Sequence, residues 1–135
     1  MKHYTFSKNE RLCSKRLIEY LFEKGQRFVS FPFSVYWCVV SSDTIPCNAQ
    51  VLINVSKRKF KRAVDRNRTK RLMRECYRLH KHELYDLLEA KNCKIVLSLS
   101  YIQDKKRNYA SMDEKYLNML DQLLCAISNS VQNDK

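Results

Sequence analysis

The sequence predicts one α+β domain in which helices pack on a single sheet. The chain has 135 residues, the length of one typical domain, and 44% of them are hydrophobic. Apolar residues follow helical spacing in three segments and strand-like patterns in three others, in the order helix, strands, helix, strand, helix. One glycine and two prolines are too few for a many-turned all-β fold. We expect this domain to span residues 1–135, with ends that fray at about 1–8 and 130–135.

The first helix is predicted within residues 13–25. Ser14 is a good N-cap residue, and Gly25 stands where a left-handed C-terminal cap favours glycine. One apolar stripe at helical spacing comprises Leu17, Ile18, Leu21 and Phe22.

Strands follow in residues 27–43, where apolar residues alternate with smaller or polar ones. Pro32 cannot donate to a β-ladder, so we expect a short strand before it and a longer one after it. Residues 49–55 form a second strand pattern, and residues 93–101 read as a buried strand.

Two further helices complete the chain. Nothing in residues 61–89 breaks a helix, since the segment has no glycine or proline. The last helix is predicted to begin at Ser111, which forms a capping box with Glu114.

Positive charge is concentrated in one of these elements. The formal net charge is +12, of which residues 57–81 carry +10 and the remaining residues +2. Such a concentration indicates a polyanionic partner, either nucleic acid or an anionic membrane surface.

A helical wheel of residues 61–81 has two sides. The apolar side holds Leu72, Met73, Cys76, Leu79 and His80, with Thr69 among them, and the basic side holds Lys70, Arg71, Arg74, Arg78 and Lys81. Like charges at these spacings repel by a few tenths of a kcal/mol per pair, a cost that a bound polyanion offsets. Ala63 and Asn67 lie on the basic side, where a nucleic-acid backbone could approach and be hydrogen-bonded. A plain solvated face and a membrane-surface helix are the alternatives.

Several function classes find little support. The six cysteines include no CxxC pair, and the first residues are charged where a secretory signal would be apolar, so we expect reduced thiols and a cytoplasmic protein. The longest uncharged run, residues 28–42, is too short to span a membrane. The HKHE sequence at residues 80–83 lacks zinc-helix spacing, and we expect no metal site or catalytic side chains on the protein. A DNA-binding helix-turn-helix is disfavoured because a strand precedes the basic helix.

The basic segment resembles the protein component of bacterial ribonuclease P. The motif is Arg66-Asn67-Arg68, Lys70-Arg71 and Arg74-Glu75, preceded by NVSKRKFKRAVD and, near the N-terminus, by RL and IEYLFEKG; the likeness covers roughly residues 11–101. It implies a mostly antiparallel sheet of about four strands, the order α-β-β-β-α-β-α and a left-handed βαβ crossover, whereas right-handed crossovers are the general rule. Similar folds occur in a ribosomal-protein domain and in domain IV of elongation factor G.

The resemblance also implies a function. In such particles an RNA subunit cleaves the 5′ leader from precursor tRNA with Mg²⁺ bound mainly by RNA, while the protein holds the RNA subunit and the leader. Residues expected to face the RNA subunit are Lys57, Ala63, Arg66, Asn67, Arg68, Lys70, Arg71 and Arg74. Residues expected in a leader-binding cleft are Ile18, Phe22, Phe33 and Tyr36, although the family often has Phe where Ile18 stands. The alternative is a ribosomal-protein-like structural RNA binder without a role in tRNA processing.

Overall fold

A computed structural model describes residues 8–132 of the chain. Its elements are η1 (Lys8–Glu10), α1 (Lys15–Lys24), β1 (Gln26–Ser30), β2 (Phe33–Val40), β3 (Ala49–Val55), α2 (Ala63–Ala90), β4 (Lys94–Tyr101) and α3 (Tyr109–Gln132). This order confirms the predicted α+β class and the break of the first strand pattern at Pro32. Most of the expected fraying falls on residues 1–7 and 133–135, outside the described part.

The four strands form one mixed sheet in the order β1-β2-β4-β3. β2 pairs antiparallel with both β1 and β4, whereas β3 pairs parallel with β4. The parallel pair is connected through α2, which is the βαβ unit that the resemblance implies. The mostly antiparallel sheet is therefore confirmed, and the hand of the crossover stays a prediction.

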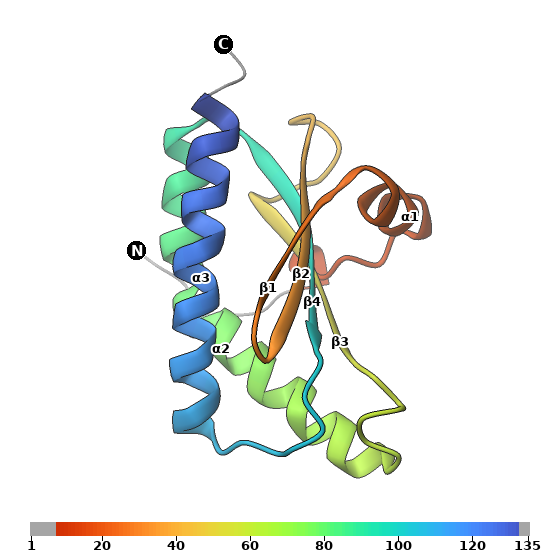
Figure 1. Ribbon diagram of the computed structural model, residues 1–135. Helices are drawn as coiled ribbons and strands as arrows, with labels where there is room; N and C mark the ends of the chain where they lie inside the picture. Colours follow the sequence, from red (N-terminus) through yellow and green to blue (C-terminus); the bar gives the residue numbers. More distant parts are fainter. Residues whose placement is uncertain (1–7, 133–135) are drawn as a thin grey trace.

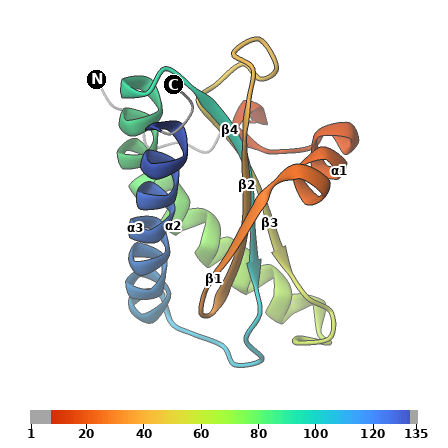
Figure 2. The same ribbon diagram turned by 45° about the horizontal axis from the view of Figure 1, so that its top comes forward.

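Helices cover the two faces of the sheet unequally. α3 and most of α2 lie along one face, and the shorter α1 lies on the other (Figures 1 and 2). Alternate residues of the central strands divide between two cores. Val35 and Leu97 pack under α2 and α3, whereas Cys38 and Val96 pack with Leu21 of α1. Because α1 has only ten residues, part of its face of the sheet stays open.

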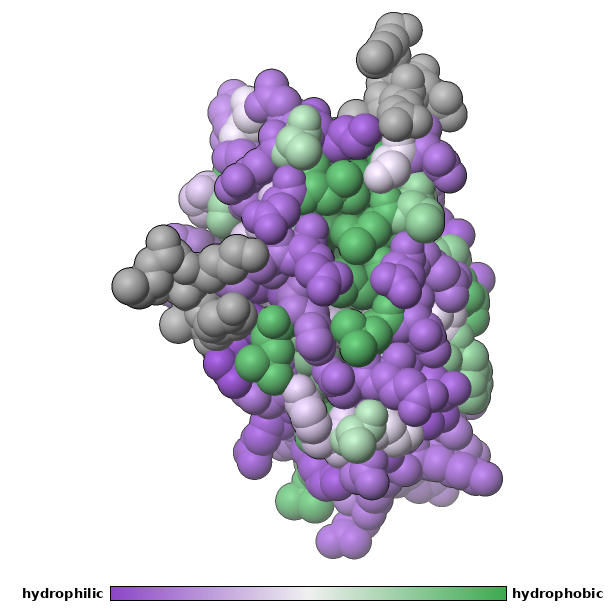
Figure 3. All heavy atoms as spheres, turned by 90° about the vertical axis from the view of Figure 1, so that its left-hand side faces the viewer, coloured by the Kyte–Doolittle hydropathy of each residue, from purple (hydrophilic) through white to green (hydrophobic). Residues whose placement is uncertain are grey.

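The helix layer carries a strip of hydrophobic surface. Seen from the helix side, this strip runs between hydrophilic side chains (Figure 3). Leu87 of α2 and Leu124 of α3 are half-buried and pack against the larger core.

The ends of α1 depend on two small residues. The Ser14 hydroxyl accepts a hydrogen bond from the Leu17 amide at 3.3 Å, which confirms the predicted N-cap. Gly25, however, is extended, with φ −72° and ψ 158°, so the prediction of a left-handed cap is wrong. Glycine is required there for space, since a Cβ would overlap the Leu21 carbonyl oxygen and lie 3.2 Å from that of Trp37.

Asparagines cap the other two helices. Asn92, just after α2, has φ 52°, a left-handed conformation that asparagine tolerates. α3 begins before the expected capping box, because the Asn108 side chain accepts a hydrogen bond from the Ser111 amide at 2.9 Å. The Ser111 hydroxyl instead accepts from Arg107 at 2.7 Å, so the box with Glu114 is wrong.

The first described residues are tied to α2 through a buried ion pair. The Lys81 ammonium donates to the Glu10 carboxylate at 2.8 Å, and the Tyr85 hydroxyl donates to the same carboxylate. The side chains of Glu10 and Lys81 are only 7% and 5% exposed. The helical wheel predicts Lys81 on the basic side of α2. That prediction is wrong, because Lys81 is buried against Glu10 of η1. The sequence does not show that η1 packs against this part of α2.

Candidate nucleic-acid interface

A compact loop, residues 56–62, leads into α2. The amides of Lys59 and Phe60 donate to the Ser56 carbonyl at 3.2 and 3.1 Å, which turns the chain sharply. Phe60 is buried and stacks on Tyr101 with ring centroids 6.0 Å apart. This anchor leaves the basic residues of the loop on the surface, and those exposed are Lys57, Arg58, Lys59, Lys61 and Arg62.

Arg66 shapes this loop from inside α2. Its guanidinium donates to the carbonyls of Phe60 and Lys61 at 2.8 and 2.9 Å, and its side chain is half-buried. Two of its hydrogen bonds thus hold the loop in place. Arg66 lies within the predicted interface, but part of its guanidinium already donates hydrogen bonds to carbonyls of the protein itself.

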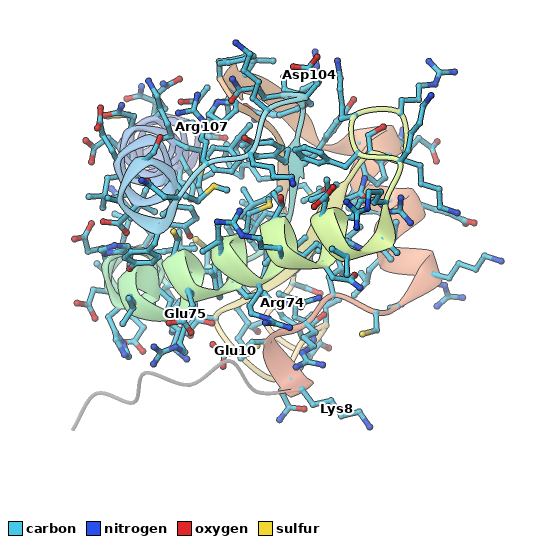
Figure 4. The ribbon with its side chains drawn as sticks, turned by 90° about the horizontal axis from the view of Figure 1, so that it is seen from below. Lys8, Glu10, Arg74, Glu75, Asp104 and Arg107 are labelled. Carbon is cyan, nitrogen blue, oxygen red and sulfur yellow. The ribbon has the colours of Figure 1, made fainter. Side chains whose placement is uncertain are left out.

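The connection between β4 and α3 lies beside the first turns of α2. Arg68 donates to the Arg107 carbonyl at 3.2 Å, and Lys106 forms an ion pair with Asp65 at 2.9 Å. The Lys106 ammonium lowers the pKa of the Asp65 carboxyl by hydrogen bonding to it. Figure 4 shows Arg107 on this connection, together with Asp104. The sequence of residues 103–110 predicts only a polar loop and does not indicate that this loop brings cations next to α2.

The remaining predicted residues lie along the first half of α2. Asn67, Arg68, Arg71 and Arg74 are exposed together with Ala63, and Lys70 is half-buried. Farther along, Arg78 forms an ion pair with Glu75 at 2.8 Å, which lowers the pKa of Glu75 and offsets the charge of Arg78. We use the term basic face for the eight predicted residues Lys57, Ala63, Arg66, Asn67, Arg68, Lys70, Arg71 and Arg74.

A second candidate surface lies where α1 meets the open face of the sheet. Phe22 and Tyr36 meet edge to face with ring centroids 4.7 Å apart, and we call them the aromatic pair. Phe22 is 45% exposed, and Tyr36 is half-buried. Ile18 is also half-buried and packs with the smaller core under α1. The structure thus places three of the four predicted cleft residues on one side of the sheet.

Phe33 lies on the opposite side. It is fully buried and meets Tyr101 and Tyr116 edge to face at 6.1 and 6.2 Å. Strand residues alternate between faces, so Phe33 and Tyr36, three positions apart on β2, point to opposite sides. The assignment of Phe33 to the cleft is therefore wrong.

Arg27 completes the open surface, and the sequence analysis missed it. β1 pairs Arg27 directly with Tyr36, and the guanidinium carbon lies 5.8 Å from the Tyr36 ring centroid. Its Nε donates to the Ser34 hydroxyl at 3.1 Å, which fixes the side chain over the strand. Only the strand register could have revealed this neighbour.

The described residues offer no cluster suited to metal binding. Within residues 8–132, no group of three or more His, Cys, Asp or Glu side chains could hold a metal ion. His80 instead bonds to Asp113 of α3 at 2.7 Å. The six cysteines are free thiols, and no helix in the described range is long and apolar enough to cross a membrane.

Comparisons with known proteins identify the family. A family model described as Ribonuclease P matches residues 6–123. The ribonuclease P protein component of Porphyromonas gingivalis strain W83 is 34% identical over 110 residues, covering 82% of this chain and 80% of that protein. The component of Chlorobaculum tepidum is 43% identical over 74 residues, covering 52% of this chain and 47% of that protein.

Solved structures share the fold. The RNase P protein of Staphylococcus aureus aligns with a TM-score of 0.66 at 21% identity, covering 84% of this chain and 94% of that one. The RNase P protein of Thermotoga maritima aligns with a TM-score of 0.63 at 21% identity, covering 84% and 96% of the two chains. With the family model matching most of its length, the chain belongs to the family of bacterial ribonuclease P protein components.

Proposed function

We propose that the basic face of α2 binds the RNA subunit of ribonuclease P, and that the open surface around the aromatic pair binds the 5′ leader of precursor tRNA. As a member of this family, the chain is a subunit of an endoribonuclease and acts in tRNA 5′ maturation. This family membership argues against the alternative, a structural RNA binder without a role in tRNA processing.

One observation carries the assignment of the basic face. Residues 57–81 hold +10 of the formal +12 charge, and the exposed cations of the loop and of α2 lie within that stretch. Contacts to Phe60, Arg107 and Asp65 hold the loop and the first turns of α2 in place, so the cations are displayed on a fixed frame. A fixed row of cations suits the phosphates of a folded RNA, and its affinity depends strongly on salt.

The open surface suits a single strand. Exposed aromatic rings stack on bases without demanding a sequence, at about 1–3 kcal/mol per base. Phe22 offers an exposed ring, Tyr36 supports it, and Arg27 supplies a cation beside Tyr36. Such a surface tolerates leaders of many sequences, as a general processing enzyme requires.

The protein's own part in the reaction is binding and orientation. The family's Mg²⁺-dependent chemistry is expected on the RNA subunit. We accordingly assign no step of phosphodiester cleavage to a side chain of this protein.

Reconstitution with the cognate RNA subunit tests both halves of the proposal. Arg68→Ala/Arg71→Ala should weaken RNA-subunit binding about tenfold at 0.15 M salt, and more at low salt, where each phosphate contact contributes more to the affinity. Tyr36→Ala should weaken binding of precursor tRNA by the holoenzyme about fivefold to tenfold, while mature tRNA, which lacks a leader, is unaffected.

The matched control removes the same charge elsewhere. Lys24→Ala/Lys115→Ala changes residues at the end of α1 and on α3, and should behave like the wild-type chain. Equal losses in the control and in the arginine variant would refute the assignment of the basic face. Equal losses for precursor and mature tRNA with Tyr36→Ala would refute the leader role.

A further inference from the structure

The segment between η1 and α1 extends the sheet at its β3 edge. Arg11 forms a parallel bridge with Val51, and the Leu12 amide donates to the Val51 carbonyl at 2.9 Å. Leu12 is buried in the core under α1. The segment is therefore fixed along β3, although it belongs to neither a long strand nor a helix.

The fold buries the acidic residue of this segment and leaves its basic residues exposed. Glu10 turns inward to Lys81 and Tyr85, so its carboxylate is buried and neutralised. Its neighbours Lys8 and Arg11 are exposed. The sequence around Glu10 thus presents cations to solvent and hides its acid.

Two hollows flank this segment. One, of about 430 Å³, is lined by residues that include Lys8, Arg11, Arg16, Leu17 and Gln50. The other, of about 140 Å³, is lined by residues that include Arg11, Leu52, Ile53 and Arg74. Arg11 and Cys13 line both, and none of the described residues that line them is Asp or Glu. We call the two together the edge furrow.

We propose that the edge furrow binds backbone phosphates of the ribonuclease P RNA subunit, as a continuation of the basic face around the edge of β3. This rests on the proposed function of the basic face. Arg74 belongs to that face and lines the furrow as well, so the two cationic surfaces are continuous. In Figure 4, Arg74 of α2 and Lys8 of η1 are seen on the same side of the molecule.

The position of the furrow favours the RNA subunit over the leader. The aromatic pair lies on α1 and β2, and β4 separates β2 from β3. Two strand spacings amount to about 10 Å, and the larger hollow meets α1 in its first turn, at Arg16 and Leu17, whereas Phe22 lies near the other end of that helix. The smaller hollow adjoins α2, the helix assigned to the RNA subunit, through Arg74.

The chemistry favours phosphate over a protein ligand. Lys8, Arg11 and Arg16 line the larger hollow, Arg11 and Arg74 line the smaller one, and no described carboxylate lines either. Among its described lining residues the larger hollow has one aliphatic side chain, Leu17, whereas the smaller hollow has an apolar floor of Leu12, Val51, Leu52 and Ile53 beneath Arg11 and Arg74. Phosphodiester groups match such a row of cations and need no apolar pocket.

The test is a salt titration of RNA-subunit binding by full-length protein. The variant is Lys8→Ala/Arg11→Ala/Arg16→Ala, and the charge-matched control is Lys24→Ala/Lys91→Ala/Lys115→Ala. Each phosphate contact contributes about 0.7–0.9 to the slope of log K against log salt, so the variant should lose about 2. Its dissociation constant should rise about tenfold to hundredfold at 0.15 M salt, whereas the control should change less than threefold.

A second variant guards against loss of the fold. Lys8→Ala/Arg16→Ala keeps the Arg11 side chain beside β3 and should lose about 1 to 2 of the slope, with an unchanged circular dichroism spectrum. Binding equal to the control in both variants would overturn the proposal. So would a defect confined to leader-bearing precursor, which would assign the furrow to the substrate.

The same titration separates this proposal from the proposed function. Arg68→Ala/Arg71→Ala removes cations of the basic face only. If that variant is weakened and the edge-furrow variants are not, the basic face stands and the furrow proposal fails. If the basic-face variant binds normally, the proposed function fails first, whatever the furrow variants do.

Discussion

Replacing Glu10 by glutamine should destabilise the protein more than any other conservative change of a single acid. The Glu10 carboxylate accepts hydrogen bonds from Lys81, at 2.8 Å, and from Tyr85. Glutamine keeps the size of the side chain but removes its charge. The Lys81 ammonium, only 5% exposed, then loses the buried Glu10 carboxylate with which it is paired.

The size of the effect follows from this burial. Breaking a buried ion pair by removing one partner costs about 3–5 kcal/mol, because the other charge stays desolvated. Folded domains are stable by only about 5–15 kcal/mol, so this is a large share. For a chain of this length, the melting temperature should fall by about 10–20 °C.

Urea unfolding followed by circular dichroism measures the change. The control is Glu19→Gln on the exposed surface of α1, which should change the unfolding free energy by less than about 0.5 kcal/mol. Glu10→Leu/Lys81→Met removes both charges and should be more stable than Glu10→Gln. If Glu10→Gln lowered the unfolding free energy by less than about 1 kcal/mol, the reasoning would be refuted. Lys81 would then behave as a solvated residue of α2.

Two further predictions concern packing and thiol chemistry. Gly25→Ala should destabilise the fold by about 1–3 kcal/mol in the same urea assay, because its Cβ would overlap the Leu21 carbonyl oxygen; an unchanged midpoint would show that α1 shifts freely. Cys125 is exposed, whereas burial raises the pKa of Cys76 to about 12. Maleimide at pH 8 should therefore modify Cys125 in the folded protein and Cys76 only after unfolding, because the thiolate is the reacting form. Mass spectrometry of proteolytic fragments identifies the modified thiol, and equal rates would contradict the buried position of Cys76.

The order of helices and strands could be predicted because it depends on local patterns. Apolar spacing located each element, and Ser14 and Pro32 marked boundaries that the structure confirms. The predicted sheet class came from the resemblance, since nothing local dictates which strands pair. The charge on α2 was equally visible, because a run of arginines requires no tertiary information.

The misplacement of Lys81 and Phe33 and the omission of Arg27 have one physical cause, which is long-range pairing. The Lys81 position could not be known without its partner Glu10, 71 residues away. Phe33 was assigned to the wrong face because the absolute orientation of β2 depends on which side receives α2 and α3. Arg27 was missed because its neighbour across the sheet, Tyr36, is set by the register of β1 with β2.

The central place of β4 constrains the order in which this protein can form as it leaves the ribosome. β4 pairs with both β2 and β3, and it is the last strand to be synthesised. Until β4 has emerged, β1 with β2 is the only pairing among the four strands β1–β4 that can form. The strongly cationic α2 is therefore made before the strand and the helix that complete its packing exist. Its arginines meet the RNA-rich surroundings of the ribosome while the domain is still incomplete, and only the final third of the chain encloses the core.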